Sequence, residues 1–382
     1  MFSLEVVPGE RIGCFVLGLG INDVLHLLQD GFLSQRPKTN IIYHETKSIH
    51  HDIVLNVVDM GMNLIFDALS QRLVSIQVFD LAKLGLRYAG SAFGSGHREK
   101  GTLLELYRLF GPTFAGSFDN GTYSLSYRGI KLCFPLPSDE FIPDLVPLEP
   151  KSGVSPSVNR LCVYHGLDEA APEIVSSFSS LNYASVSNGV RLSTINSFYM
   201  SVMDVDINIG IHNKSMAVKL GAPAQEVIVN LGQPSKIYFK KDERMKIHHM
   251  KDDSFDTYSL VEREICFRAV DYFYNYFDLG IDVLFDALTH AVIKIVIHCN
   301  QPGHPDFSQY NKCNFNVHIQ GNLVTPEMKW PEIEEVVGSC GKPMIHDTGT
   351  ASNPFGGSCL YASQGCVWEI MKSGNIASFT IF

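Results

Sequence analysis

Two aspartates, Asp67 and Asp286, are candidates for a catalytic pair, because two carboxylates can share general acid and base work. Both lie in one recurring motif, which reads GMNLIFDALSQRLVSI at residues 61–76 and GIDVLFDALTHAVIKI at residues 280–295. The glycine, the Phe-Asp-Ala-Leu run and the isoleucine recur at a constant offset of 219 residues. An aspartate that begins a turn accepts hydrogen bonds from the backbone amides that follow it. We therefore interpret both carboxylates as turn residues of an antiparallel hairpin that the chain uses twice.

Four histidines are candidate metal ligands: His248, His249, His298 and His304. The first two are adjacent, so within a strand their side chains point to opposite faces. No carboxylate or cysteine stands at a spacing that would complete a zinc site with them. His304, in the run QPGHP, is typical of a turn that follows a strand. We predict no metal site.

Other motifs for catalysis or cofactor binding are missing from the sequence. Gly18-Leu19-Gly20 precedes a predicted helix, but it lacks the third glycine and the acidic partner of a dinucleotide site. Neither a Gly-x-Ser-x-Gly elbow nor a P-loop occurs. We therefore expect no catalytic residue, no cofactor and no enzymatic activity.

The hairpin motif belongs to a longer repeating pattern. Weaker copies begin at Gly129 and Gly365, each with a bulky apolar residue five positions after its glycine. A short segment with apolar residues at helical spacing precedes each of the four glycines, at residues 22–28, 102–110, 224–231 and 331–337. The pattern predicts an α+β fold of internally repeated helix-plus-antiparallel-meander units, arranged as two similar halves.

Length and composition favour two domains. The chain has 382 residues and 45% hydrophobic residues, enough for more than one buried core. We predict a first α+β half at residues 1–188 and a second at residues 189–382, each with two units. A proline-rich insertion is expected in the first half at residues 135–156, and a charged insertion in the second at residues 240–268. Surface loops of this length are often functional.

Charge and cysteine usage limit the class of protein. The net charge of −10 is spread without long acidic or basic blocks, which argues against nucleic-acid binding. Glu5, Pro8 and Glu10 stand where a signal peptide would carry basic residues and then an apolar core, and no apolar run reaches the roughly 18 residues of a membrane span. The nine cysteines form no Cys-x-x-Cys pair, as is typical of reduced thiols in the cytosol. We expect a cytoplasmic protein.

The run YFYNYF is a candidate protein interface. In a strand, Tyr272, Tyr274 and Tyr276 share one face, and an exposed row of tyrosines suits partner binding because the rings supply contact area at low entropy cost. The alternative is a strand packed on both faces.

A small basic cluster lies in the charged insertion and could bind anionic lipid headgroups or an acidic partner. It comprises Lys240, Lys241, Arg244, Lys246 and Lys251. Four nearby acidic residues, Asp242, Glu243, Asp252 and Asp253, offset these charges. A solvated loop is therefore the alternative interpretation.

Several segments of the chain together resemble the phagosome assembly factor 1 family. They are SLEVVPGERIG near the amino terminus, HHDIVLNVVDMGMNLIFDALSQRLVSIQVFDL, YFKKDERMKIHH, DYFYNYFDLGIDVLFDALTHAVIKIVIHCNQPGH, NPFGGSCLY and NIASFTIF. They occur in order and span nearly the whole chain. The proline-rich insertion, residues 94–100 and residues 168–186 carry the resemblance least.

The resemblance implies a non-enzymatic cytosolic regulator of autophagy. Such a protein would act in complex with a large β-propeller scaffold of the WD-repeat type and be recruited to the phagophore assembly site, also called the preautophagosomal structure. Family-like segments that could contact the partner comprise Pro302, Gly303, His304, Asn353, Pro354 and Phe355. The alternative is a phosphoinositide-binding membrane adaptor that uses the basic cluster at residues 240–251.

Overall fold

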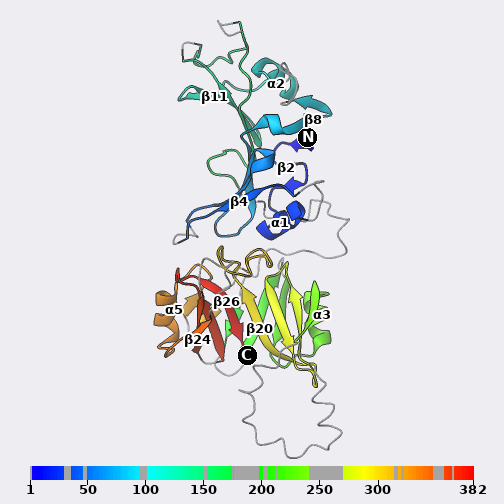
Figure 1. Ribbon diagram of the computed structural model, residues 1–382, viewed down its shortest axis with the longest axis vertical. Coiled ribbons are helices and arrows are strands. Elements are labelled where there is room, and N and C mark those ends of the chain that lie inside the picture. The colour runs from blue at the N-terminus through cyan, green and yellow to red at the C-terminus, as the bar shows by residue number, and fades with distance from the viewer. Residues whose placement is uncertain are drawn as a thin grey trace, which may run out of the picture. The chain divides into compact units, whose positions relative to one another are not determined.

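The chain forms two compact units in the computed structural model, Met1–Asn182 and Tyr183–Phe382. The structure describes residues 2–29, 36–45, 50–93, 101–138, 140–148, 153–173, 175, 198–200, 205–211, 214–240, 270–313, 317–319, 322–346, 357–363 and 365–382. The expected boundary at Asn188 lies outside these residues. Each unit is described by itself below (Figure 1).

The first unit contains a large antiparallel sheet with the strand order β10-β11-β12-β13-β7-β6-β5-β4. Its strands are β4 (Thr39–Ile42), β5 (Ile53–Val57), β6 (Met62–Phe66), β7 (Leu73–Val78), β10 (Ser117–Asp119), β11 (Thr122–Tyr127), β12 (Ile130–Pro135) and β13 (Arg160–Tyr164). Each half of the sheet is a meander, and the last strands of the two meanders, β7 and β13, pair at its centre. The proline-rich segment connects β12 to β13.

A smaller sheet completes the first unit, with the order β3-β2-β1-β8-β9. It consists of β1 (Phe2–Val7), β2 (Arg11–Ile12), β3 (Phe15–Val16), β8 (Leu84–Tyr88) and β9 (Ser91–Phe93), and β1 pairs with β8 in parallel. Two α-helices, α1 (Ile21–Gln29) and α2 (Leu103–Phe110), and two 3-10 turns, Val58–Met60 and Leu81–Lys83, lie between the strands.

The second unit has the same order of strands in both of its sheets. The large sheet, β17-β18-β19-β20-β26-β25-β24-β23, consists of β17 (Lys236–Phe239), β18 (Tyr272–Tyr276), β19 (Ile281–Phe285), β20 (Val292–His298), β23 (Met344–His346), β24 (Ser358–Ser363), β25 (Cys366–Ile370) and β26 (Ile376–Ile381). The smaller sheet, β16-β15-β14-β21-β22, consists of β14 (Phe198–Met200), β15 (Val205–Ile211), β16 (Lys214–Lys219), β21 (Val317–Ile319) and β22 (Asn322–Val324). The helices are α3 (Ala224–Leu231) and α5 (Trp330–Val337).

Alternating side chains build the core of the second unit. On the large sheet, every second residue of a strand is apolar and buried, as in Ile281, Val283 and Phe285 of β19. These side chains form one cluster with Val227 of α3 and Ile333 of α5. In Figure 1, α3 lies toward the β20 side of the unit and α5 toward the β24 side. We call the face that packs on the helices the inner face of this sheet, and the opposite one the outer face.

The α+β prediction of repeated helix-plus-meander units is wrong, because the chain is predominantly β. The four α-helices in the described part of the chain have only eight or nine residues each, whereas 26 strands form four sheets. The prediction left out the smaller sheet of each unit. Its strands are short and come from chain segments far apart in sequence, as in the parallel pair of β1 with β8. Hydrophobic periodicity within one segment does not reveal such a pairing.

The glycine that opens each hairpin is required by the backbone and by close packing. Gly61 and Gly280 have φ angles of +62° and +70°. A Cβ atom on Gly280 would lie 2.3 Å from the carbonyl oxygen of Asn311. A Cβ atom on Gly61 would lie 2.5 Å from the Cβ of Asp80. Both positions therefore exclude a side chain.

We predict that Gly280→Ala lowers the free energy of unfolding of the second unit by about 3 kcal/mol, since left-handed strain adds to a clash with backbone. Gly221→Ala is the matched control, because Gly221 has a φ angle of +81° and a Cβ atom there would meet no other atom within 4 Å. It should cost about 1 kcal/mol. Urea unfolding followed by tryptophan fluorescence measures both, since the two tryptophans, Trp330 and Trp368, lie in the second unit. Equal losses would contradict the packing argument.

Candidate functional site

The outer face of the large sheet in the second unit carries a row of polar side chains. The row crosses the sheet from strand to strand and consists of Asn275 (β18), Asp282 (β19), His298 (β20), Ser378 (β26), Glu369 (β25), Ser358 (β24) and His346 (β23). Strand register explains the row: Asn275 pairs with Asp282, His298 with Ser378, Ser378 with Glu369, and Ser358 with His346. Cross-strand partners of this kind lie on the same face of a sheet.

A loop at residues 299–313, which we call the covering loop, lies over this polar row. It is anchored by backbone hydrogen bonds: the amide of Cys299 donates to Ala377 (3.0 Å), that of Asn311 to Phe277 (2.8 Å) and that of Cys313 to His298 (2.9 Å). Its polar residues are buried as well, with Asn300, Gln301, Asn311 and Lys312 between 4% and 8% exposed. Most of the polar row is consequently shielded from solvent.

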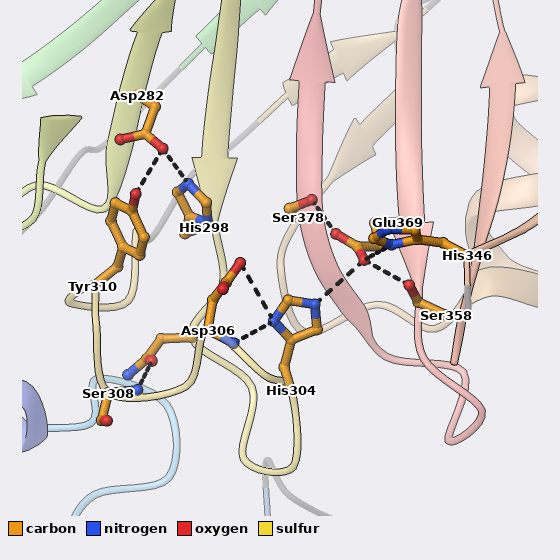
Figure 2. Close-up of polar contacts among 11 residues, drawn as sticks. Asp282, His298, His304, Asp306, Ser308, Tyr310, His346, Ser358, Glu369 and Ser378 are labelled. Carbon is orange, nitrogen blue, oxygen red and sulfur yellow. Dashed lines mark hydrogen bonds and ion pairs between the residues drawn. The ribbon is translucent and has the colours of Figure 1, made fainter. Parts of the chain in front are cut away.

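Asp282 is the centre of the first of two buried clusters (Figure 2). The phenol of Tyr310 donates to its Oδ2 atom (2.7 Å), His298 Nε2 lies 3.0 Å from the same atom, and Asn275 Nδ2 donates to Oδ1 (2.7 Å). The ring of Tyr310 stacks on that of His298, with 3.7 Å between centroids. Burial and the carboxylate of Asp282 raise the pKa of Tyr310, so its hydroxyl stays protonated and serves as a donor.

Glu369 is the centre of the second cluster (Figure 2). The hydroxyls of Ser358 and Ser378 donate to its two oxygens at 2.6 and 2.7 Å. His304 Nε2, from the covering loop, lies 3.3 Å from Oε1, and Nδ1 of the exposed His346 lies 3.5 Å from the same oxygen. Burial acts to raise the pKa of Glu369, but the hydrogen bonds and the charge of His304 outweigh it and lower the pKa to about 2.

His304 responds in the opposite direction. Burial acts to lower its pKa, while the hydrogen bond and charge of Glu369 and the charge of Asp306 raise it. In the neutral ring, Nδ1 accepts the amide hydrogen of Asp306 (3.2 Å), which leaves the Nε2 hydrogen to donate to Glu369. His304 therefore binds the covering loop to β25 in either protonation state.

Both carboxylates act as hydrogen-bond acceptors that hold the loop on the sheet. A serine nucleophile would need its hydroxyl directed at a histidine nitrogen. Here Ser358 and Ser378 direct their hydroxyls at Glu369 instead. In the portion of the chain that the structure describes, no group of three or more His, Cys, Asp or Glu side chains could hold a metal ion.

The equivalent face of the first unit carries a simpler arrangement. Asn56 donates from Nδ2 to Oδ1 of Asn63 at 2.6 Å, at the register positions of Asn275 and Asp282. Further along, Lys131 and Glu169 form an ion pair at 2.9 Å. Burial and the neighbouring Glu169 raise the pKa of the Cys162 thiol, which keeps it protonated. At the register position of Asp282, the first unit therefore has the uncharged side chain of Asn63.

The turn interpretation of Asp67 and Asp286 is confirmed. Asp67 Oδ2 accepts hydrogen bonds from the amide and hydroxyl of Ser70, both at 2.7 Å. Asp286 Oδ1 accepts from the amide and hydroxyl of Thr289 at 2.7 and 2.8 Å. Burial acts to raise the pKa of Asp286, but these hydrogen bonds outweigh it and lower the pKa.

The candidate row of tyrosines does not face outward, and the alternative of a strand packed on both faces is the one that the structure shows. Tyr272, Tyr274 and Tyr276 are at most 9% exposed and belong to the core cluster on the inner face. Their rings pack on apolar neighbours, as Tyr274 does on Phe285 with 4.6 Å between centroids. On the opposite face of β18, Asn275 is buried and Phe273 is half-buried, so the strand is packed on both sides.

Some of the remaining candidate residues lie in the described part of the chain and others do not. Pro302, Gly303 and His304 lie in the covering loop, where the side chain of His304 is buried against Glu369. The amide of Lys240 donates to Asp271 at 2.9 Å, directly after β17. The others lie outside the described residues: His248, His249, Lys241, Arg244, Lys246, Lys251, Asn353, Pro354 and Phe355.

Sequence reasoning missed the two carboxylates at the centres of the clusters. The available signal was a charged residue inside an otherwise apolar strand, Asp282 in GIDVLF and Glu369 in GCVWEI. A buried carboxylate requires donors. Nothing local identifies the donors, because His304 is 65 residues from Glu369 in sequence.

We predict a pH-dependent stability difference between the native chain and Glu369→Gln. The folded pKa of about 2 is below the ordinary value of 4.5, so the contribution of Glu369 is present above pH 4.5 and is lost as the pH falls toward 2. The pKa of His304 is raised from 6.5, so its contribution is present below pH 6.5 and is lost as the pH rises through the folded value. Between pH 4.5 and pH 6.5, where both contributions are present, Glu369→Gln should lower the free energy of unfolding by about 3 kcal/mol relative to the native chain.

Urea unfolding at a series of pH values, with tryptophan fluorescence as the signal, measures this difference. Glu335→Gln, on the exposed side of α5, is the control and should change stability by less than about 0.5 kcal/mol at every pH. A Glu369→Gln penalty that stays constant from pH 2 to pH 8 would contradict the electrostatic interpretation.

Comparison with known proteins confirms the resemblance seen in the sequence. The family model described as phagosome assembly factor 1 matches residues 11–382. A PHAF1 protein of Arabidopsis thaliana is 35% identical over 402 residues, covering 99% of this chain and 92% of the relative. PHAF1 proteins of Drosophila melanogaster and Caenorhabditis elegans are 29% and 26% identical, covering 100% and 96% of this chain and 94% and 90% of the relatives.

No solved structure matches the chain. In the described part of the chain, none of the helices has the length and apolar character needed to cross a membrane. Because the family model and the Arabidopsis relative both cover nearly the whole sequence, the chain belongs to the phagosome assembly factor 1 family, whose name fits an autophagy-related factor in phagosome assembly.

Proposed function

We propose that the protein is a non-enzymatic regulator of autophagy that acts as a protein-interaction subunit. Its partner in this proposal is a β-propeller scaffold of the WD-repeat type, and its place of action is the phagophore assembly site. Family membership supports the link to autophagy. The partner, the site of action and the absence of catalysis are the steps that the proposal adds.

The proposal rests on one observation, which is that the buried polar groups form hydrogen bonds with one another. Asp282 and Glu369 each accept hydrogen bonds from protein donors, and the covering loop lies over most of both clusters. A catalytic site concentrates polar groups that stay available to a substrate in a concave pocket. Here the polar groups instead bind one another. This arrangement suits a protein-interaction subunit that contacts its partners through its exposed surface.

Exposed apolar side chains at the edges of the sheets support protein interaction. Met344 and Ile345, on the edge strand β23, are 64% and 75% exposed. Phe114, which precedes β10, is 92% exposed. Side chains of this kind bury area when a partner binds.

The alternative of a phosphoinositide-binding adaptor rests on the basic cluster of the charged insertion. Of its residues only Lys240 is described, and no contact of this lysine points to a phosphate ligand. We therefore do not carry lipid binding forward as a second function.

His346→Ala tests the non-enzymatic proposal. His346 is the exposed member of the Glu369 cluster, and its side chain is 53% accessible, so it is the group there that a substrate could reach. In cells that lack the native protein, we expect this variant to restore phagophore recruitment and co-precipitation of the β-propeller scaffold to native levels.

Glu369→Gln serves as the destabilised control and should lower the amount of protein recovered. The readouts are fluorescence microscopy of phagophore puncta and co-precipitation normalised to the amount of chain. Loss of rescue by a stably folded His346→Ala chain that still co-precipitates the β-propeller scaffold at native levels would contradict the non-enzymatic proposal, whereas loss of both would point to a partner contact at the edge strand β23. A native chain that recovers no β-propeller scaffold would overturn the partner assignment.

A further inference from the structure

β17 forms one edge of the large sheet in the second unit. Its residues pair with β18 only on one side, from Lys236 with Asn275 to Phe239 with Tyr272, and within the described residues no strand pairs on its other side. An edge strand presents unpaired amide and carbonyl groups along its free side. These groups can pair with another extended segment.

The side chains of β17 are unusually apolar for a free edge. Ile237, Tyr238 and Phe239 are 48%, 44% and 59% exposed. Proteins commonly protect such edges with prolines, bulges or a covering segment, yet β17 pairs with β18 in regular register without a bulge. The rings of Tyr238 and Phe239 each contact an aromatic ring of β18, at 6.5 and 5.8 Å between centroids, and remain partly exposed.

Lysines lie along the outer side of this strand. Lys236 and Tyr238 are on the outer face, and Lys240 continues the alternation directly after the strand. Lys294 of β20 also lies nearby: burial lowers its pKa, and the positive charge of Lys240 adds to the effect. Asp271 lies across the ladder from Lys240, but the lysines outnumber it, so this edge is basic although the whole chain has a net charge of −10.

The equivalent edge strand of the first unit, β4, has no lysine among its own residues, and one lysine, Lys38, directly precedes it. Asn40 pairs with Asn56 at the register position where Lys236 pairs with Asn275. Ile41 and Ile42 occupy the positions of Ile237 and Tyr238. β17 therefore differs from β4 in having one lysine within the strand and a second directly after it.

We propose that β17 binds an extended segment of a partner protein by strand addition. Acidic side chains of that segment would face Lys236 and Lys240, and apolar side chains at the alternating positions would cover Ile237 and Phe239. The proposal rests on the protein-interaction function proposed above and names the surface and the chemistry of the contact. Charge complementarity selects an acidic partner segment.

A second copy of the chain fits this edge poorly. Antiparallel pairing of two β17 strands about Tyr238 would place Lys236 of one copy opposite Lys240 of the other. Like charges directly across a ladder are unfavourable. The lysines therefore disfavour self-association at this edge while they favour an acidic partner.

The test uses the purified full chain and a fluorescently labelled peptide of alternating glutamate and valine, long enough to span β17. Fluorescence anisotropy should detect binding that weakens when NaCl rises from about 50 to about 500 mM. Lys236→Glu/Lys240→Glu should lower the affinity about tenfold or more. Lys372→Glu, an exposed lysine of the same unit, should leave the affinity unchanged.

Two further peptides and a milder variant separate charge from backbone pairing. A peptide of alternating lysine and valine should bind poorly to the native chain and better to Lys236→Glu/Lys240→Glu. A glutamate and valine peptide with a central proline should bind more weakly, because proline cannot donate to the ladder. Lys236→Asn, which introduces the residue of β4, keeps the test valid if the double variant fails to fold, and should weaken binding about threefold.

Hydrogen exchange should show that the peptide protects amides of residues 236–240. Equal binding of acidic and basic peptides, or protection elsewhere, would overturn the proposal. Binding to phosphatidylserine vesicles that requires the same lysines, without peptide binding, would overturn it in favour of a membrane surface, and dimerisation lost on Lys236→Glu/Lys240→Glu would do so in favour of a second copy. Co-precipitation of the β-propeller scaffold without peptide binding would refute this surface and leave the proposed function standing.

Discussion

A carboxylate removed from water needs donors that replace its hydration, and this requirement governs the outer face of the second large sheet. Glu369 meets it with two serine hydroxyls from the strands on either side and His304 from the covering loop. The loop is therefore held by charge-assisted hydrogen bonds as well as by its backbone anchors. Removing one partner of such a buried pair is costly, because the other partner is left without its counter-charge.

The two units share one architecture but differ in the polar residues on the outer face of the large sheet. Both large sheets have the same strand order, yet Asn63 stands at the register position of Asp282. The asparagine needs only its neighbour Asn56, whereas the aspartate engages Asn275, His298 and Tyr310. One ionisable side chain thus accompanies a polar network and the covering loop in the second unit, while the inner face stays apolar.

Sequence reasoning succeeded where local chemistry decides the structure. Asp67 and Asp286 were identified because a turn needs an acceptor for its amides, and the repeat marked Gly61 and Gly280, whose positive φ angles require glycine. It failed where distant segments meet. The inward direction of Tyr272 depends on which face the helices cover, and the smaller sheets require pairings between strands far apart, so neither could be inferred from periodicity.

The central pairings of the large sheets have a consequence for how the chain folds. Each meander can form from neighbouring hairpins. The two meanders of a large sheet join only when β7 pairs with β13, or β20 with β26, and these partners are far apart in sequence. Contacts between such distant segments form slowly, because loop-closure entropy precedes the gain from pairing. During synthesis we expect the apolar strands β7 and β20 to be open edges for a time, which is the state in which β proteins aggregate and chaperones act.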